Sequence, residues 1–425
     1  MTAYQTGQLI RVALSDFIRQ TVMNLIVFAS PLHDAESVMS CRQGLFDKLR
    51  DNSFRRLYGL PEDDILNIVD GTGTSLPSEN AVCFIATGGT EELFRERLGE
   101  LHGDIVLLSD GYHNSLAASF EIASYLERRE IRARLVNIPL ESGNEGHAGT
   151  EAVGNMHRSS FGDIYSPRVL EYLRGSTVGL IGGASPWLIA SDVDLAYVAS
   201  EFGTRFVDIG IEELADAYRR TAGTLSGETG GEEERLKAAD NMEKALRAIV
   251  EKYRLTALTV KCFDLLGSCR TTACLALARL NDDGIVSGCE GDIPALWTMM
   301  AVYARRGRAP FMANPSSSDR ERLRVDFAHC TVPTSMTESF SLPTHFESGT
   351  GVGIAGILPT GRYSIVKIGG RRLDRFYGAE GTVTANTNIV QRCRTQVSFR
   401  FDSLEDFDRF FANRLGNHIV LVPAF

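Results

Sequence analysis

The 425-residue sequence predicts an α/β protein that ends in a β-rich part. Up to about residue 310, short apolar runs alternate with amphipathic stretches, a pattern typical of a parallel sheet covered by helices on both faces. Beyond that point, short alternating runs separated by glycine and proline replace this pattern. The length exceeds what one hydrophobic core usually supports, so we expect more than one domain.

The first part of the chain contains four apolar runs that predict strands, with amphipathic helices between them. The predicted strands are 24–28, 82–85, 104–108 and 134–138, and the predicted helices are 34–50, 90–100 and 115–128. Residues 9–22 have the pattern of a short amphipathic helix, which we interpret as a packing or subunit-contact arm. The Gly-, Asn- and His-rich stretch 143–160 predicts a loop.

A second α/β unit and a β-rich unit follow. The predicted elements of the second unit are strands 177–181, 205–209 and 257–260 and helices 232–252 and 271–280, with a polar linker or helix entry at 222–235. The predicted strands of the last unit are 323–328, 363–368, 396–401 and 419–423. These last strands predict a small barrel or a sandwich. The three predicted domains are 1–172, 173–310 and 311–425.

Composition narrows the classes of protein. The 44% hydrophobic and 23% charged content is ordinary for a globular protein. A formal charge of −10 and the lack of a basic run argue against binding to nucleic acid. No apolar segment has the length of a membrane span, and the first residues lack a secretory pattern. The eight cysteines follow neither a secreted nor a metal-binding spacing, which favours a cytoplasmic protein without a cysteine metal site.

The turn Gly288-Cys-Glu-Gly-Asp292 is the most informative segment. Glycines on both sides of Glu290 indicate a sharp turn or a close approach at the end of a strand, where α/β enzymes place their chemistry. Asp292 has a structural explanation as the N-cap of a helix with Pro294 in its first turn. Glu290 has no such explanation, so we interpret it as functional rather than as an ordinary surface glutamate.

Two histidines on later apolar strands complete a candidate divalent-metal site. His329 and His418 each stand next to an apolar run, and each taken alone is as compatible with a buried core histidine as with a metal ligand. His345 and Glu347 form a polar pair that is a candidate for contact with a substrate. Asp264, at the predicted end of a strand, is a candidate acid beyond the metal ligands, although an ion pair with Lys261 explains it as well.

Two sites in the first half are weaker candidates. The segment 87–91 follows a strand and offers backbone amides at the start of a helix, but it completes no nucleotide-binding fingerprint. His113 belongs to a His-Asn-Ser segment that has a helix-capping pattern, and it is a further candidate for substrate contact.

Taken together, these segments resemble the L-fucose isomerase and L-arabinose isomerase superfamily. The resemblance rests on Glu290 in Gly-Cys-Glu-Gly-Asp, on His329 in Ala-His-Cys-Thr-Val-Pro, on the His345-Phe-Glu-Ser-Gly segment and on His418 in Gly-Asn-His. It implies two Rossmann-like or flavodoxin-like α/β domains followed by a β-rich, barrel-like C-terminal domain. It also implies a metal-dependent aldose–ketose isomerase, with Mn²⁺ as the first expected cation, and a homo-oligomer with sites at subunit interfaces.

The resemblance assigns roles and exposes one departure. It implies that Glu290 is a metal ligand and a proton carrier and that His418 is a ligand, while His329 matches the arabinose branch alone. The second catalytic carboxylate of the family would fall within 311–314, where this chain has Ala313 and Asn314. The amide of Asn314 can coordinate a cation but cannot act as a base. Asp264 or a metal-bound water is then left to supply the second proton transfer. Two alternatives stay open: an epimerase or lyase on the same scaffold, and a non-catalytic sugar-binding protein.

Overall fold

The computed structural model describes residues 21–77, 81–140, 164–222 and 231–424. The predicted loop at 143–160 lies outside these residues, as do most of the linker at 222–235 and all of the predicted helical arm at 9–22 except its last two residues. Within the described chain, two parallel sheets with helices and a closed antiparallel barrel form the fold. The sequence therefore predicted the α/β class and the β-rich end correctly, and the barrel replaces the sandwich alternative.

The first sheet is parallel and has the strand order β2-β1-β3-β4-β5. Its strands are β1 Val22–Phe28, β2 Ile65–Asp70, β3 Ala81–Ile85, β4 Ile105–Ser109 and β5 Ala133–Asn137. The accompanying helices are α2 Ala35–Ser40, α3 Gln43–Leu49, α4 Asn52–Leu57, α5 Glu91–Arg97, the short 3₁₀ helix η1 Leu98–Glu100 and α6 Ser115–Glu127. β1 and β3 are buried apolar strands, as their runs of Val, Ile, Leu and Phe predict.

The second sheet is also parallel and has the order β7-β6-β8-β9. Its strands are β6 Thr177–Ile181, β7 Arg205–Ile209, β8 Ala257–Val260 and β9 Val286–Gly288. Its helices are α7 Pro167–Arg174, α8 Leu195–Phe202, α9 Ile211–Ala222, α10 Glu232–Tyr253, α11 Asp264–Cys269, α12 Cys274–Asp282 and α13 Ile293–Arg306. Asp292 caps α13 as predicted, because its side chain accepts a hydrogen bond from the Ala295 N–H at 2.7 Å.

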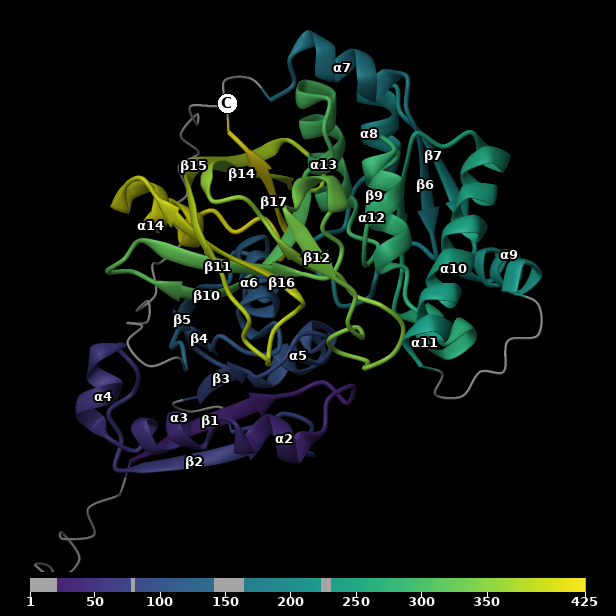
Figure 1. Ribbon diagram of the computed structural model, residues 1–425. Helices are drawn as coiled ribbons and strands as arrows, with labels where there is room; N and C mark the ends of the chain where they lie inside the picture. The colour runs from purple at the N-terminus through teal and green to yellow at the C-terminus, as the bar shows by residue number, and fades with distance from the viewer. Residues whose placement is uncertain (1–20, 78–80, 141–163, 223–230, 425) are drawn as a thin grey trace, which may run out of the picture.

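The barrel closes in the order β10-β11-β16-β15-β14-β17. Its strands are β10 Phe311–Asp319, β11 Arg324–His329, β14 Gly361–Gly369, β15 Arg375–Asn386, β16 Thr395–Phe401 and β17 Ile419–Pro423. The remaining elements of this part are η2 Thr334–Met336, the pair β12 Ser339–Ser341 and β13 Ala355–Ile357, and helix α14 Leu404–Ala412. Figure 1 shows the first sheet at the bottom of the molecule, the second sheet at the right, and the barrel in green and yellow above the first sheet and to the left of the second.

Two helices connect the sheets to the barrel. Residues 115–126 of α6 are all buried, and α6 contacts strands of the first sheet as well as β10 of the barrel. Helix α13 is buried along most of its length between the second sheet and strands β10, β14 and β17. Helices buried on all sides lie inside a protein rather than at its surface. The barrel therefore shares its apolar contacts with both α/β units, and the three parts meet along one seam.

Several predicted helices differ from the observed ones. The predicted helix 34–50 is two helices, because the chain turns at Cys41 and Arg42, where Arg42 is buried against Asp110. The predicted helix 271–280 begins later, as α12. Asp264 does not lie at a strand end but begins α11, after a turn that follows β8. All eight cysteines are free thiols. Among the described residues, no helix combines the length and the apolar character needed to cross a bilayer.

Candidate metal centre and cavity

The register of the barrel brings three predicted ligands to one end of adjacent strands. In the antiparallel pairing of β10 with β11, Asn314 lies opposite Ala328, the neighbour of His329. In the pairing of β10 with β17, Ala313 lies opposite Ile419, the neighbour of His418. Residues far apart in the chain thus become neighbours, since paired backbones lie about 5 Å apart. Asn314, His329 and His418 therefore form a row across β11, β10 and β17.

Glu290 reaches this row from the carboxyl edge of the second sheet. It lies in the turn between β9 and α13 with a left-handed φ of 60°, which is uncommon for a residue other than glycine. The next residue, Gly291, has a φ of 69°, and a Cβ there would lie 2.4 Å from the Gly183 carbonyl oxygen. The Ser185 hydroxyl donates to the backbone oxygen of Glu290 at 2.5 Å. The turn is thus fixed by close backbone packing, as its glycines predicted.

The side chains of Glu290, His329 and His418 converge. Their ligand atoms all lie within 4.8 Å of one another. Glu290 Oε1 lies 3.5 Å from His329 Nε2 and 3.6 Å from His418 Nε2. The Trp187 indole N–H donates to the other carboxylate oxygen, Oε2, at 3.3 Å. Both imidazoles are buried, and the Glu290 side chain is 13% exposed.

Each histidine is oriented through its other ring nitrogen. His418 Nδ1 lies 2.9 Å from Asp292 Oδ2, and a carboxylate can only accept, so Nδ1–H donates. His329 Nδ1 lies 2.8 Å from the Thr331 hydroxyl. Histidines that bind metals usually bond through the second nitrogen in this way, because the bond fixes the tautomer and the direction of the ring. Both rings therefore present Nε2 toward Glu290.

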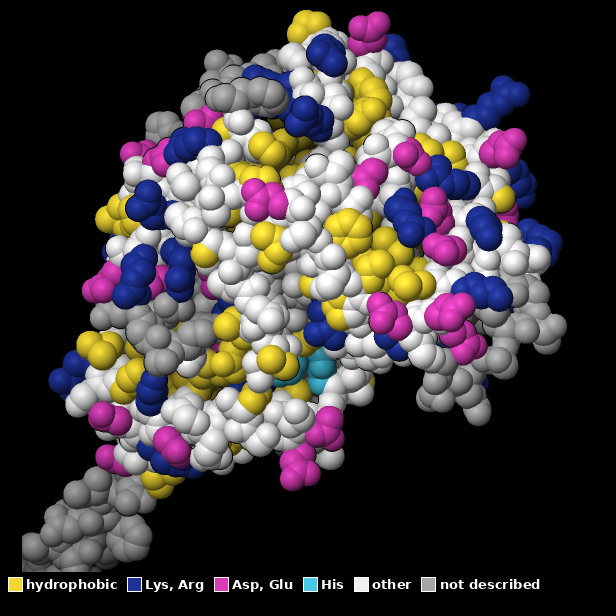
Figure 2. Space-filling model, in the orientation of Figure 1, with side chains coloured by type: hydrophobic (Ala, Val, Ile, Leu, Met, Phe, Trp, Pro, Cys, Tyr) yellow, Lys and Arg dark blue, Asp and Glu magenta, His cyan; other side chains and the backbone are white. Residues whose placement is uncertain are grey.

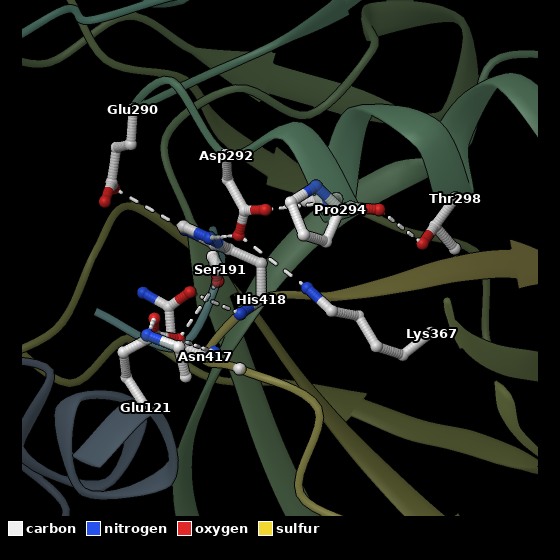
Figure 3. A network of polar contacts seen from close by, with 12 residues as sticks. Glu121, Ser191, Glu290, Asp292, Pro294, Thr298, Lys367, Asn417 and His418 are labelled. Carbon is white, nitrogen blue, oxygen red and sulfur yellow. Dashed lines mark hydrogen bonds and ion pairs between the residues drawn. The ribbon is translucent and has the colours of Figure 1, made fainter. Parts of the chain in front are cut away.

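Asp292 joins the cluster to a buried lysine. Figure 3 shows Asp292 between His418 and Lys367, with Glu290 on the other side of His418. Lys367 Nζ lies 3.7 Å from Asp292 Oδ2, and both side chains are almost completely buried. Burial by itself raises the pKa of Asp292, but the charges of Lys367 and His418 outweigh it and lower the pKa. Asp292 thus stays a carboxylate while it also caps α13.

A second buried carboxyl supports the backbone around His418. Glu121, on α6, accepts hydrogen bonds from the N–H groups of Ala190 and Asn417 at 2.6 and 3.0 Å and from the Ser191 hydroxyl at 3.2 Å (Figure 3). Burial and the nearby charge of Asp292 raise the pKa of Glu121 to about 7. Glu121 therefore links the first α/β unit to the segment that carries His418.

A cavity lies where the three parts of the fold meet. The first sheet contributes Glu91 and Asn114, the second contributes Trp187, Phe263 and Glu290, and the barrel part contributes Asn314, Glu347 and Asn417. The carboxyl edges of both parallel sheets thus face one space, the usual position of a ligand in such sheets. Figure 2 shows histidine side chains, in cyan, at the seam between the N-terminal layer and the rest of the molecule.

Two further carboxyl groups line this cavity, and their protonation differs from that of Glu290. The Asn114 amide donates to Glu347 Oε1 at 2.5 Å. Burial and the charge of Glu290 raise the pKa of Glu347 to about 8. Burial also raises the pKa of Glu91, whose Oε2 is buried without a hydrogen-bond partner. Burial raises the pKa of Glu290 as well, but His418 and His329 outweigh that effect and hold it below its usual value.

The remaining sequence-predicted residues lie in three different settings. Asn314 lines the cavity, is buried, and its Oδ1 has no hydrogen-bond partner. Asp264 forms an ion pair with Lys261 at 3.0 Å and is absent from the cavity lining, as the alternative explanation proposed. His345 and His113 are also absent from the lining. They pack against the aromatic rings of Phe263 and Phe346, and burial lowers the pKa of His345 to about 4 and that of His113 to about 3.

Sequence analysis missed two groups that matter here. Glu91 follows the Thr-Gly-Gly-Thr segment that was noted for its backbone amides, and its carboxyl was overlooked. The signal was a glutamate at the first position of the helix that follows a buried parallel strand, on the side of the sheet where such proteins place their ligands. Lys367 was also overlooked, although a lysine within the apolar run 363–368 is a strong indication of a buried charge with a partner.

The donor set fits a divalent cation. One carboxylate oxygen and two imidazole nitrogens suit Mn²⁺, Zn²⁺ and related ions, and the amide oxygen of Asn314 adds a neutral donor. His418 Nε2 and Asn314 Oδ1 are both buried without a hydrogen-bond partner, although buried polar atoms normally have one. A cation held by these residues would satisfy both atoms. Fold and site together thus define a candidate metal centre at the junction of two α/β units and a barrel.

Comparison with known proteins points to sugar isomerases. Over 183 residues the chain is 24% identical to a sulfoquinovose isomerase of Alkalicoccus urumqiensis, which covers 38% of this chain and 39% of that protein. It is 25% identical over 179 residues to a sulfoquinovose isomerase of Priestia megaterium (38% and 40% covered) and 28% identical over 120 residues to one of Clostridium sp. (28% and 27%). The chain thus spans about two fifths or less of the length of these curated relatives. No family model matches it.

The name of these relatives agrees with the sugar-isomerase class that the sequence predicts. The L-fucose and L-arabinose isomerase superfamily in particular stays a prediction, as does the Rossmann-like or flavodoxin-like character of the two α/β units.

Proposed function

We propose that this protein is a divalent-cation-dependent aldose–ketose isomerase that acts on an open-chain sugar bound in the cavity. The convergence of Glu290, His329 and His418 within 4.8 Å carries the proposal, and Glu290 also lines that cavity. The partial similarity to proteins named sulfoquinovose isomerase supports the class of reaction.

Glu290, His329 and His418 would hold the cation, with Asn314 as a neutral fourth donor and Mn²⁺ as the first expected ion. Such a cation, when bound, stabilises negative charge that develops on adjacent substrate oxygens, as in an enediolate. The chain itself orients the donors: Asp292 and Thr331 fix the two imidazoles, and Trp187 fixes the second oxygen of Glu290. A site fixed in advance needs little reorganisation during the reaction.

Glu290 is the proposed carrier of the proton that moves between C1 and C2. A carboxylate beside these carbons removes the C2 proton and returns it to C1. The pKa of Glu290 is held below its usual value, so the group is ionised and ready to accept a proton. The charge that develops at the substrate oxygens needs stabilisation, which the cation would supply.

The identity of the sugar is a question for a substrate panel. The relatives are named for sulfoquinovose, a sulfonated sugar. The described residues that line the cavity include acidic side chains but no lysine or arginine. A panel should therefore contain neutral sugars, such as L-fucose and L-arabinose, beside sulfoquinovose.

The test is conversion of aldose to ketose by the Mn²⁺-loaded protein, followed by NMR in D₂O. We expect a ketose with deuterium at C1, and we expect Glu290→Gln to abolish its formation while thermal unfolding stays cooperative. Glu338→Gln, at an exposed glutamate outside the cavity, is the matched control and should leave conversion unchanged. Epimers or cleavage products would replace the isomerase proposal by one of its rivals. Failure to take up any stoichiometric cation would favour a sugar-binding protein.

A further inference from the structure

Glu347 lies in the cavity but not in the cation cluster. It belongs to the loop between β12 and β13, and it lines the same cavity as Glu290 and Asn314. It is not among the residues whose ligand atoms lie within 4.8 Å of one another. Its carboxyl group is therefore placed to reach a molecule in the cavity rather than the proposed cation.

One oxygen of Glu347 is held by a strained segment of the first α/β unit. Asn114, at the start of α6, donates from Nδ2 to Glu347 Oε1 at 2.5 Å. His113 and Asn114 have left-handed φ values of 51° and 59°, and two consecutive non-glycine residues rarely adopt this conformation. Such strain persists where the surroundings impose it, often at functional sites. The strained turn directs Asn114 away from capping α6, where its side chain makes no cap hydrogen bond, and toward Glu347.

The surroundings of Glu347 favour its neutral form. The titratable groups that act on it are Glu290, Cys330 and His418, and it acts in turn on Glu91 and Cys393. Burial and the negative charge of Glu290 dominate, and they raise the pKa of Glu347 to about 8. In the metal-free protein these surroundings favour the carboxylic acid, the form that can donate a proton.

The proposed reaction needs such a group. Conversion of an aldose to a ketose moves one proton between carbons and one between oxygens, and Glu290 serves the carbons alone. Asn314 cannot carry the second proton, because an amide is neither acid nor base at neutral pH. Asp264 is paired with Lys261 outside the cavity lining.

We propose that Glu347 is the second catalytic acid–base residue and moves the proton between the O1 and O2 oxygens of the sugar. This inference rests on the proposed isomerase function. Glu290 takes the C2 proton, the C2–H electron pair forms the C1–C2 double bond, and the carbonyl π electrons move to O1, which takes the proton of Glu347. The O2 proton then passes to Glu347 as the C2 carbonyl forms, and C1 takes the proton from Glu290. Both residues return to their starting states, and no other reactant is consumed.

The experiment compares Mn²⁺-loaded wild type with Glu347→Gln, using the sugar that the wild type converts. We expect kcat to fall about 10²- to 10⁴-fold, the range for loss of a general acid–base group. We expect the Mn²⁺ content and the melting temperature to stay close to those of the wild type. The decline of wild-type kcat/KM at high pH, where Glu347 loses its proton, should disappear in whatever activity remains. Glu338→Gln, an exposed glutamate near the same loop, should match the wild type in every measurement.

Four results would overturn the inference. Retention of more than about a tenth of wild-type kcat by Glu347→Gln would exclude a catalytic role, since loss of such a group costs far more. If kcat/KM of the variant still declined at high pH as in the wild type, another group would be responsible for that decline. If Glu347→Gln does not fold, Glu347→Asp, which keeps the carboxyl group, must retain activity with a shifted high-pH limb, and a wild-type profile would count against Glu347. Wild type that loads Mn²⁺ but converts no sugar would instead refute the isomerase function itself, and the role of Glu347 with it.

Discussion

The carboxyl groups on the two sides of the cavity have pKa values that are shifted in opposite directions. On the cation side, formed by Glu290, Asn314, His329 and His418, the two imidazoles and the carboxylate have oriented partners, and the pKa of Glu290 is lowered. On the carboxyl side, formed by Glu91, Asn114 and Glu347, the acids are buried with few partners, and their pKa values are raised. The same residue type, glutamate, is therefore an anion on one side and a neutral acid on the other.

This difference shows that the neighbouring charges, rather than burial alone, determine whether a buried carboxyl group is protonated. Burial raises the pKa at both Glu290 and Glu347. The outcome is opposite because Glu290 faces two imidazoles, whereas Glu347 faces the negative charge of Glu290 itself. Pairs of carboxyls whose environments separate their pKa values are typical of enzymes that need an acid and a base at one pH.

The strongest challenge to the cation side is removal of His418. We expect His418→Gln to weaken Mn²⁺ binding by about a thousandfold or more, because loss of a ligand costs more than the 10- to 100-fold loss of an outer partner. Isothermal titration calorimetry measures this affinity directly. His102→Gln, at an exposed histidine, is the matched control. Equal affinities for the two variants would show that the cluster does not hold the cation.

A subtler change tests the orientation of His418. We expect Asp292→Asn to weaken Mn²⁺ binding about 10- to 100-fold, since the imidazole loses its carboxylate partner. Asparagine is as good an N-cap as aspartate, so the start of α13 should be preserved. Buried Lys367 would lose its counter-charge, which should lower the melting temperature.

The double variant Asp292→Asn, Lys367→Met separates these two effects. It removes the buried charge together with its partner and should restore stability, but not Mn²⁺ affinity. Recovery of affinity by the double variant would mean that Lys367, rather than the lost carboxylate, caused the weaker binding.

Much of the fold could be predicted from the sequence, because local residue patterns specify many of its strands and helices. The apolar runs at β1, β3, β4, β6 and β8 predicted parallel strands, and Asp292 with Pro294 predicted the start of α13. Other elements depend on tertiary contacts. Strand β2 is largely exposed, and Asn67 interrupts its apolar residues. The predicted helix 34–50 is interrupted where Arg42 turns inward to bond Asp110 and the Ala86 carbonyl. Helix α14 was missed although Ser403 and Asp406 form a capping pattern.

The residues of the candidate site also fall into those that a local pattern predicts and those that depend on tertiary contacts. Glycines around Glu290 and histidines beside apolar strands are local signals, and the structure brings Glu290, His329 and His418 together. On the carboxyl side, Glu347 was a predicted candidate and Glu91 was not, and the two face one cavity only because the first α/β unit meets the loop after β12. The protonation of Glu347 depends on Glu290, a residue 57 positions away in sequence.

A substitution at Asn314 should increase the affinity of the site for the cation. Its buried, unpartnered Oδ1 makes Asn314→Asp a nearly isosteric way to add a charge among the proposed ligands. We expect Mn²⁺ affinity to rise about tenfold, because affinity for hard cations grows with the number of charged oxygen ligands. Asn67→Asp, at an exposed position on β2, should leave the affinity unchanged. A lack of change in Asn314→Asp would place Asn314 outside the ligand set.

The smallest expected effect is on the pH dependence of the melting temperature, and it tests the raised pKa of Glu347. Glu347 has a pKa of about 8 in the folded protein and an ordinary value of 4.5, so the folded state holds its proton more tightly than the unfolded chain does. Its contribution is full below the ordinary value and is lost as the pH rises toward 8. We expect the melting temperature of the metal-free wild type to decline over this window, and Glu347→Gln to reduce the decline by about 2–5 °C, as a change of a few kcal/mol implies for a chain of this size. Thermal unfolding in the presence of a chelator measures both curves. Glu338→Gln is the control and should follow the wild type. Parallel curves for all three proteins would mean that Glu347 titrates like an ordinary glutamate. The two sides of the cavity would then not differ as described.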